Sequence, residues 1–158
     1  MVLDVEDYDP AKGEAKAKHG LIQLKAILDA FRATGTKREV GFYGYVPLVD
    51  YWRTVTPMDS EKYREWQKQN DRAAPLAKGV DALFPSIYTY YPDEARWVTN
   101  ATAQICDARR LSSKPVYVFL WPHYHNEGNL RPPRPIPGSY WTRQLETASR
   151  LAARRIHG

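Results

Sequence analysis

The sequence of 158 residues is long enough for one domain with a buried core, and we expect a single domain over residues 1–158. Its net charge of +5 suits a polyanionic partner, either an acidic polysaccharide or a nucleic acid. The single cysteine excludes an internal disulfide, and no apolar run is long enough to span a membrane. The 11 tyrosines and 5 tryptophans favour half-wet surfaces such as a sugar-binding cleft.

Four runs rich in apolar and β-branched residues predict strands. The first run ends in carboxylates, and the fourth is apolar almost throughout, as in a parallel sheet that helices cover on both faces. The third run contains Pro85, which favours a distorted or terminal position in a ladder. The predicted strands cover residues 2–6, 40–46, 81–88 and 115–121.

Four helical patterns alternate with these strands. They cover 14–34, from 59 or 60 to about 73, from 93 or 94 to about 111, and from 139 to about 156. Pro75 should break the second helix, and the proline-rich stretch 127–137 is typical of a loop beside an active site. The β-α order, repeated four times, predicts an α/β fold with a parallel sheet, open or closed into a barrel. We expect a TIM-barrel-like fold of four parallel β-α units, which is an incomplete barrel.

Two acids lie at the end of the first predicted strand. Asp4 and Glu6 are two residues apart, so their side chains point to one face of the strand. Like charges in one small volume cannot both ionise cheaply, so one carboxyl group should keep its proton and could serve as a general acid. The alternative is a strand that simply ends in solvated acids, because Asp7 and Asp9 follow.

Aromatic residues end the other three predicted strands. Ligands of parallel α/β sheets and barrels bind beyond the carboxyl ends of the strands, so these rings should meet the two acids at one edge. The candidate substrate-binding residues are Tyr43, Tyr45, Tyr88, Trp121 and Tyr124. Their convergence makes Asp4 and Glu6 the favoured catalytic residues.

These strands resemble, in the same order, four strand motifs of the hyaluronidase family of glycoside hydrolases, whose fold is a distorted (β/α) barrel. The matching blocks are VLDVEDYDP at 2–10, GFYGY at 41–45, LFPSIY at 83–88 and VFLWPHY at 118–124. The first block resembles the family's Asp-x-Glu strand. The order and spacing of the blocks carry the resemblance, which extends over essentially the whole chain.

The resemblance implies a glycosidase that cleaves a β-linked N-acetylhexosamine-containing polysaccharide. It makes Glu6 the acid that protonates the glycosidic oxygen and Asp4 the residue that orients the substrate's N-acetyl group as an internal nucleophile. Such a retaining, substrate-assisted reaction needs no second carboxylate at nucleophile distance. It also implies that Tyr43 or Tyr45, Tyr88 and Tyr124 line the sugar subsite.

The chain departs from the family in charge and in extent. Asp7 and Asp9 add negative charge beside the catalytic pair and should repel a uronic-acid polymer, which disfavours hyaluronan itself. The resemblance covers only the middle of the family's barrel, so we expect a fragment or truncated form of a longer barrel. Two copies would supply eight strands, which leaves a homodimer open.

Other functions remain open from the residues alone. An incomplete barrel could be a carbohydrate-binding relic that stacks sugars without cleaving them. Asp4, Glu6, Asp7 and Asp9 could bind a hard cation, or His123 and His125 a zinc ion, although a third zinc ligand is missing.

Nucleic-acid binding ranks last, because the basic residues fall mostly on predicted helices and the proline-rich loop rather than at the aromatic strand ends. No phosphate-binding loop or cofactor fingerprint occurs, so we predict no cofactor, no metal and no membrane partner.

Overall fold

The computed structural model describes residues 1–5, 14–125 and 134–153. Within these ranges the chain forms six helices and one two-stranded parallel sheet, which confirms the mixed α/β class. None of the described helices is long and apolar enough to cross a membrane. In chain order the elements are β1 (Val2–Leu3), α1 (Glu14–Ala33), β2 (Gly41–Phe42), α2 (Tyr51–Thr54), α3 (Glu61–Arg72), α4 (Ala74–Gly79), α5 (Glu94–Leu111) and α6 (Gly138–Ala153).

The four predicted helices are confirmed as α1, α3, α5 and α6, within a few residues at each end. Their starts follow from local capping: Ser60 and Asp93 accept backbone N–H groups in the first turns of α3 and α5. Residues 154–156, the predicted end of the last helix, lie outside the described residues.

Two short helices were not predicted. In α2, the carboxylate of Asp50 accepts the backbone N–H of Arg53 and starts a single turn. The second predicted helix ends before Pro75, as expected, with Ala73 as the C-cap of α3; Pro75 itself lies in the first turn of α4, where its missing N–H costs no hydrogen bond. Both helices are too short for an apolar periodicity to show in the sequence.

The prediction of four full strands is wrong in extent. Among the described residues only β1 and β2 form a ladder, in which Val2 lies opposite Gly41 and Leu3 opposite Phe42. The third and fourth predicted strands are joined by isolated parallel bridges, Leu83 to Val116 and Ser86 to Phe119. The finer prediction, an incomplete barrel of four β-α units, is therefore not confirmed by regular strands.

Pro85 gives a physical reason for the interruption. The bridges on either side of it keep one register, and the backbone N–H groups of Tyr117 and Phe119 donate to the carbonyls of Leu83 and Pro85. Pro85 has no N–H to return the intervening bond, so the ladder breaks at this residue. A parallel bridge from Tyr43 to Phe84 joins the third segment to β2, so the four segments still lie in chain order.

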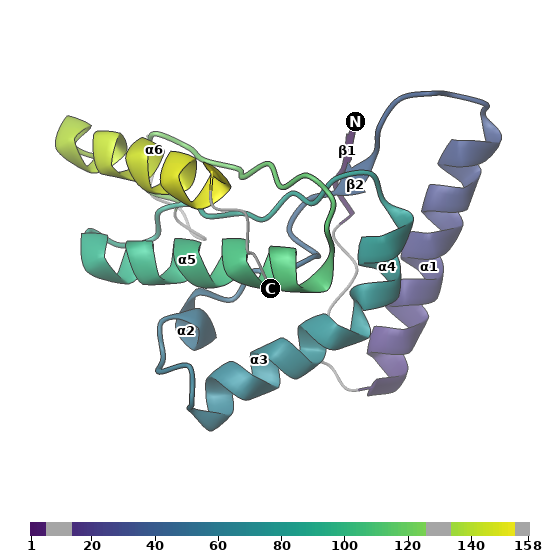
Figure 1. The fold of residues 1–158 in the computed structure, drawn as a ribbon, viewed down its shortest axis with the longest axis horizontal. Coiled ribbons are helices and arrows are strands. Elements are labelled where there is room, and N and C mark those ends of the chain that lie inside the picture. The colour runs from purple at the N-terminus through teal and green to yellow at the C-terminus, as the bar shows by residue number, and fades with distance from the viewer. Residues whose placement is uncertain (6–13, 126–133, 154–158) are drawn as a thin grey trace.

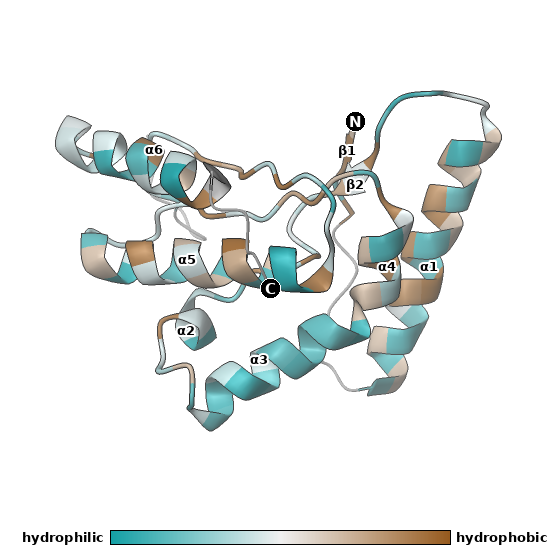
Figure 2. Cartoon of the chain, in the orientation of Figure 1, coloured by the Kyte–Doolittle hydropathy of each residue, from teal (hydrophilic) through white to brown (hydrophobic). Residues whose placement is uncertain are grey.

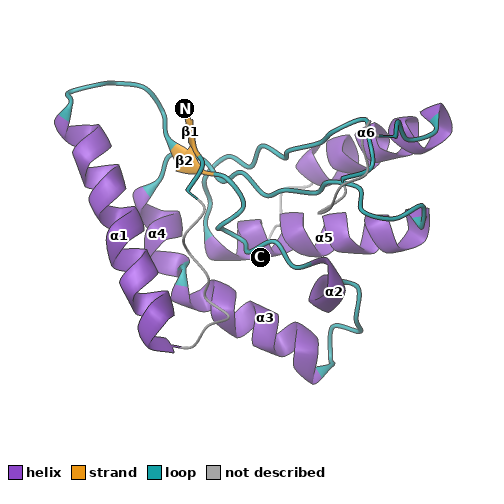
Figure 3. Ribbon diagram, turned by 180° about the vertical axis from the view of Figure 1, so that it is seen from behind, coloured by secondary structure: helices purple, strands orange, loops and turns teal. Residues whose placement is uncertain are grey.

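Helices cover these extended segments in two groups. Figure 1 shows α1 beside α4 and α5 beside α6, with the extended segments between the two groups, and Figure 3 shows the same arrangement from behind. In Figure 2 much of the central extended chain is brown, whereas α3 is mostly teal. One buried cluster joins α1 and α4 to β2, and a second joins α5 and α6 to Ile87 and Tyr124.

Asp81 ties α1 to the start of the third segment. Its carboxylate accepts the backbone N–H of Val40 at 2.9 Å and pairs with the guanidinium of Arg32 at 2.6 Å. Partial burial disfavours the charged carboxylate, but the Val40 N–H and Arg32 outweigh it and hold the pKa of Asp81 below its ordinary value of 3.8.

We expect Asp81→Asn to destabilise the fold at neutral pH by about 1 kcal/mol. Because the folded-state pKa is lowered, this contribution is fully present above 3.8 and is lost as the pH falls through and below that value. Urea unfolding between about pH 3 and pH 7 should give wild-type and Asp81→Asn curves that converge on the acid side. Asp29→Asn, which removes an exposed pair with Lys25, is the matched control and should change little. A constant difference between wild type and Asp81→Asn at every pH would contradict this account.

Gly41 lies where β2 meets the third segment most closely. A Cβ built on it would overlap the carbonyl oxygen of Ala82 and lie 2.7 Å from Cε2 of Phe84. The first of these atoms is backbone and cannot rotate away. Only glycine therefore allows β2 to pack against its neighbour.

Gly41→Ala should destabilise the protein by about 3 kcal/mol, because backbone must move to admit the methyl group. Gly138→Ala is the control, since a Cβ there meets nothing within 4 Å. Chemical denaturation of both variants compares the two free energies of unfolding. Equal stability of Gly41→Ala and Gly138→Ala would show that the close approach at Ala82 is not present in solution.

Candidate functional site

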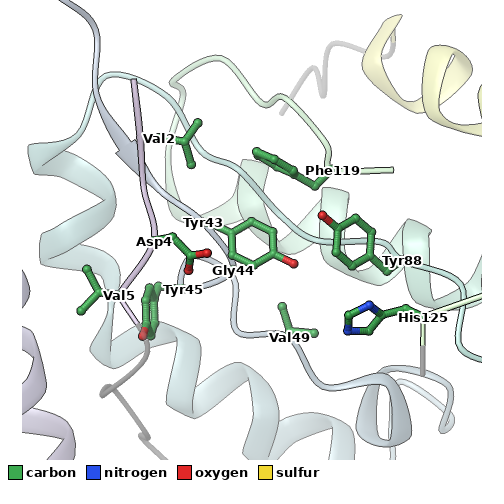
Figure 4. Close-up of a pocket in the computed structure, with 10 residues that line it drawn as sticks. All are labelled: Val2, Asp4, Val5, Tyr43, Gly44, Tyr45, Val49, Tyr88, Phe119 and His125. Carbon is green, nitrogen blue, oxygen red and sulfur yellow. The ribbon is translucent and has the colours of Figure 1, made fainter. Parts of the chain in front are cut away.

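A pocket of about 680 Å³ opens at the ends of β1, β2 and the two extended segments beside them. We call it the central pocket. Figure 4 shows residues from all four segments around it. It is lined by Val2, Asp4, Val5, Tyr43, Gly44, Tyr45, Val49, Tyr88, Phe119 and His125.

Asp4 is the described member of the predicted catalytic pair. It follows β1 directly and lines the central pocket together with Val2, while Leu3 between them packs against the core of α1 and α4. Over residues 2–4 this alternation is what the strand pattern predicts, whereas Val5 both lines the pocket and packs against that core. In Figure 4 the carboxylate of Asp4 points toward Tyr43. Glu6, the predicted proton donor, lies outside the described residues.

Tyr43 stands at the centre of the pocket and is held from two sides. Its hydroxyl donates to Oγ of Ser86 at 3.0 Å, and its ring lies 5.0 Å from Phe119 and 6.1 Å from Tyr88 between centroids. Burial raises the pKa of Tyr43 above its ordinary value, against the opposite effect of the Ser86 hydroxyl. The phenol therefore stays protonated, and because its one O–H donates to Ser86, its oxygen can accept a hydrogen bond from a ligand hydroxyl or amide group.

The third segment directs Tyr88 into the pocket, and the buried Ser86 to the same side, because its alternate residues are fixed by α5 and α6. The indole N–H of Trp97 donates to the carbonyl of Ile87 at 2.8 Å. Gln144 donates to the hydroxyl of Thr89 at 2.7 Å. Since Ile87 and Thr89 face the helices, Ser86 and Tyr88 face the opposite side, where the pocket lies.

The predicted aromatic residues of the fourth segment do not meet in one place. Trp121 is half-buried, and its ring lies 6.3 Å from that of Tyr88, at the border of the central pocket. Tyr124 is only 6% exposed and packs in the cluster of α5 and α6. The two residues are three apart, so strand alternation places them on opposite faces, and only Trp121 neighbours the pocket.

His125 is a pocket residue that the sequence reasoning assigned a different role. The sequence pairs it with His123 as candidate zinc ligands. Its ring lies 5.1 Å from Tyr88 and 6.0 Å from Trp121, and its backbone N–H donates to the carbonyl of Thr89 at 2.6 Å. The sequence could have indicated this position. His125 lies an even number of residues from Phe119 and Trp121, so strand alternation places all three side chains on the same face.

The described part of the chain contains no group of three or more His, Cys, Asp or Glu residues that could hold a metal ion. Of the four acids in the metal hypothesis, only Asp4 is described; Glu6, Asp7 and Asp9 are outside the described ranges. The described lining of the central pocket offers one carboxylate, several phenols and an imidazole. Such groups can accept and donate hydrogen bonds to sugar hydroxyl and amide groups, while the ring faces pack against C–H groups.

The fold is similar to that of the hyaluronidase class of glycoside hydrolases, which confirms the resemblance expected from the four sequence blocks. Two of the solved structures that it matches are of bee venom hyaluronidase. Its monoclinic crystal structure has a TM-score of 0.73 and 16% sequence identity, over 96% of this chain and 60% of the hyaluronidase chain. Its complex with a hyaluronic acid tetramer has a TM-score of 0.72 and 16% identity, over 95% and 57% respectively. This chain therefore spans about 60% of the length of the enzyme it resembles. No protein-family model and no curated protein sequence matches the chain.

Proposed function

We propose that the chain is the central part of a (β/α) barrel glycosidase that acts on a β-linked N-acetylhexosamine-containing oligosaccharide or polysaccharide. The observation that carries this proposal is the central pocket, where Asp4 from the end of β1 meets Tyr43, Tyr45 and Tyr88 from the neighbouring segments. The similarity of the fold to bee venom hyaluronidase supports it. The four parallel segments would be four β-α units of an incomplete barrel.

The proposed reaction uses the substrate's own acetamido group as nucleophile. Glu6 donates a proton to the glycosidic oxygen while the acetamido carbonyl oxygen attacks the anomeric carbon, and the bond to the leaving sugar breaks. Water then opens the cyclic intermediate at the same carbon and returns its proton to Glu6, so the anomeric configuration is retained. Asp4 holds the acetamido N–H and stabilises the positive charge that develops on that group.

Tyr43 and Tyr88 position the sugar for this reaction. Tyr43 stays protonated and its hydroxyl is oriented by its donation to Ser86, so its oxygen can accept a hydrogen bond from a hydroxyl group of the reacting sugar. The half-buried ring of Tyr88 forms a wall of the pocket beside it. A pocket built this way orients the sugar before reaction, which is where positioning contributes most to the rate.

A carbohydrate-binding relic is the second candidate, favoured by the fact that the chain covers 60% of the matched hyaluronidase. In that case the pocket would bind sugars without cleaving them. A homodimer, in which a second copy supplies further strands, stays a prediction of the sequence.

We expect Glu6→Gln to lower kcat/KM by about 10²- to 10⁴-fold, because the general acid is lost, while sugar binding survives. Asp4→Asn should lower the rate as well, since the neutral amide stabilises the charged acetamido group less. Hydrolysis of β-1,4-linked N-acetylglucosamine oligomers and of hyaluronan, followed by reducing-end release, measures these rates. Asp29→Asn on α1 is the control acid and should behave as wild type.

Two outcomes separate the candidates. If the wild type binds these sugars but cleaves none of them, the relic is correct. If Glu6→Gln cleaves as fast as wild type, or if a de-N-acetylated oligomer is cleaved as fast as the acetylated one, the substrate-assisted mechanism fails.

A further inference from the structure

A second pocket, of about 310 Å³, lies next to the central pocket. We call it the aromatic pocket. Val49 and His125 line both pockets, so the two share a wall. The aromatic pocket is lined by Val49, Asp50, Tyr51, Trp52, Tyr90, Tyr91 and His125.

Two large rings are exposed at this pocket. The side chain of Trp52 is 61% exposed and that of Tyr91 is 42% exposed, and their ring centroids lie 5.3 Å apart. Large apolar rings gathered at the mouth of a pocket mark a binding surface rather than a scattered surface residue. The polar edge of each ring can stay in water while its face takes a ligand.

The rings are held in place before any ligand binds. Tyr51 is buried beneath them, with its ring 5.5 Å from that of Trp52 and 5.2 Å from that of Tyr91. Asp50 caps α2 and pairs with the guanidinium of Arg53, which in turn donates to the side-chain oxygen of Gln69 on α3 at 2.7 Å. Because these contacts already hold the rings of Trp52 and Tyr91 in place, their side chains lose little conformational entropy when a ligand binds.

The charges around the pocket select the ligand. Of its described lining residues, one carries a carboxylate, Asp50, and none is a lysine or arginine. The described lining of the central pocket likewise includes Asp4 and no lysine or arginine. Among the described residues, neither lining offers a permanent cation to a uronate, and each presents a carboxylate that repels one, so these linings favour an uncharged sugar over hyaluronan.

We propose that the aromatic pocket is a second sugar subsite, in which an uncharged hexose or N-acetylhexosamine residue of the same oligosaccharide stacks on Trp52 and Tyr91. This inference rests on the proposed function, because the neighbouring sugar occupies the central pocket. His125 lies between the two subsites: its ring is 5.1 Å from Tyr88 in the central pocket and 5.5 Å from Tyr90 in the aromatic pocket. The ligand is therefore an uncharged oligosaccharide that passes over His125.

The test measures how affinity depends on oligosaccharide length. Calorimetric titration of the full chain with N-acetylglucosamine and with N,N′,N″,N‴-tetraacetylchitotetraose gives Kd values for wild type, Trp52→Ala, Trp52→Phe and Tyr117→Ala. Tyr117 is the matched control, an aromatic residue that is 53% exposed and lines neither pocket. Trp52→Ala should weaken tetramer binding roughly tenfold and leave the monosaccharide Kd unchanged. Trp52→Phe should keep most of the tetramer affinity, and Tyr117→Ala should match wild type.

The outcomes distinguish this inference from the proposed function. If wild type binds the monosaccharide but Trp52→Ala leaves tetramer affinity unchanged, or weakens both sugars equally, the second subsite is refuted while the central pocket stands. If wild type binds neither sugar, the proposed function fails and this inference with it. Tighter binding of a hyaluronan tetrasaccharide than of tetraacetylchitotetraose would overturn the assignment of an uncharged sugar. A change in sedimentation of Trp52→Ala without a change in sugar binding would identify the surface as a protein interface instead.

Discussion

Parallel pairing of the four extended segments is the constraint on which the rest of the structure depends. It begins with the ladder between β1 and β2 and continues through the bridges from Tyr43 to Phe84 and from Ser86 to Phe119. Because all four segments run in one direction, their carboxyl ends meet at one edge. The pocket at that edge collects side chains that are far apart in the chain, from Asp4 to His125.

One face of these extended segments packs against the helices, and the other face lines the central pocket. Residues that face the helices are buried and hydrogen-bonded to helix side chains. The indole N–H of Trp97 donates to the carbonyl of Ile87, and the side-chain amide of Gln144 donates to the hydroxyl of Thr89. The alternate residues are left for the pocket and make mostly side-chain contacts with one another, such as Tyr43 with Ser86. The helix side therefore holds the fold, and the pocket side is free to carry recognition. The aromatic pocket extends that recognition surface onto α2, outside the extended segments.

The sequence predicted some parts of this arrangement better than others, for physical reasons. The four long helices follow from their apolar periodicity and their caps, whereas α2 and α4 are too short to show a period. The third and fourth strands are shorter than predicted because Pro85 removes one hydrogen bond from the ladder between them. Asp4, Tyr43, Tyr45 and Tyr88 were identified for the pocket because they end strands.

The fourth segment shows the limit of that reasoning. Its motif put Trp121 and Tyr124 together, but alternation separates them, and His125 takes the place beside Tyr88. A helix-facing residue and a pocket-facing residue look alike when both are aromatic and the register is unknown. Trp52 and Tyr91 lie beyond the strand ends, and only the folded chain brings them together.

The central claim is that the strand ends form one sugar-binding pocket. Titration of isotope-labelled protein with N,N′,N″,N‴-tetraacetylchitotetraose, followed by NMR, tests it most directly. The account predicts that the largest amide shift changes fall on Asp4, Gly44, Tyr88 and His125, which line the central pocket. Shift changes confined to the groove between α1 and α4, at Leu21, Leu28 and Leu76, or the absence of any change, would contradict it.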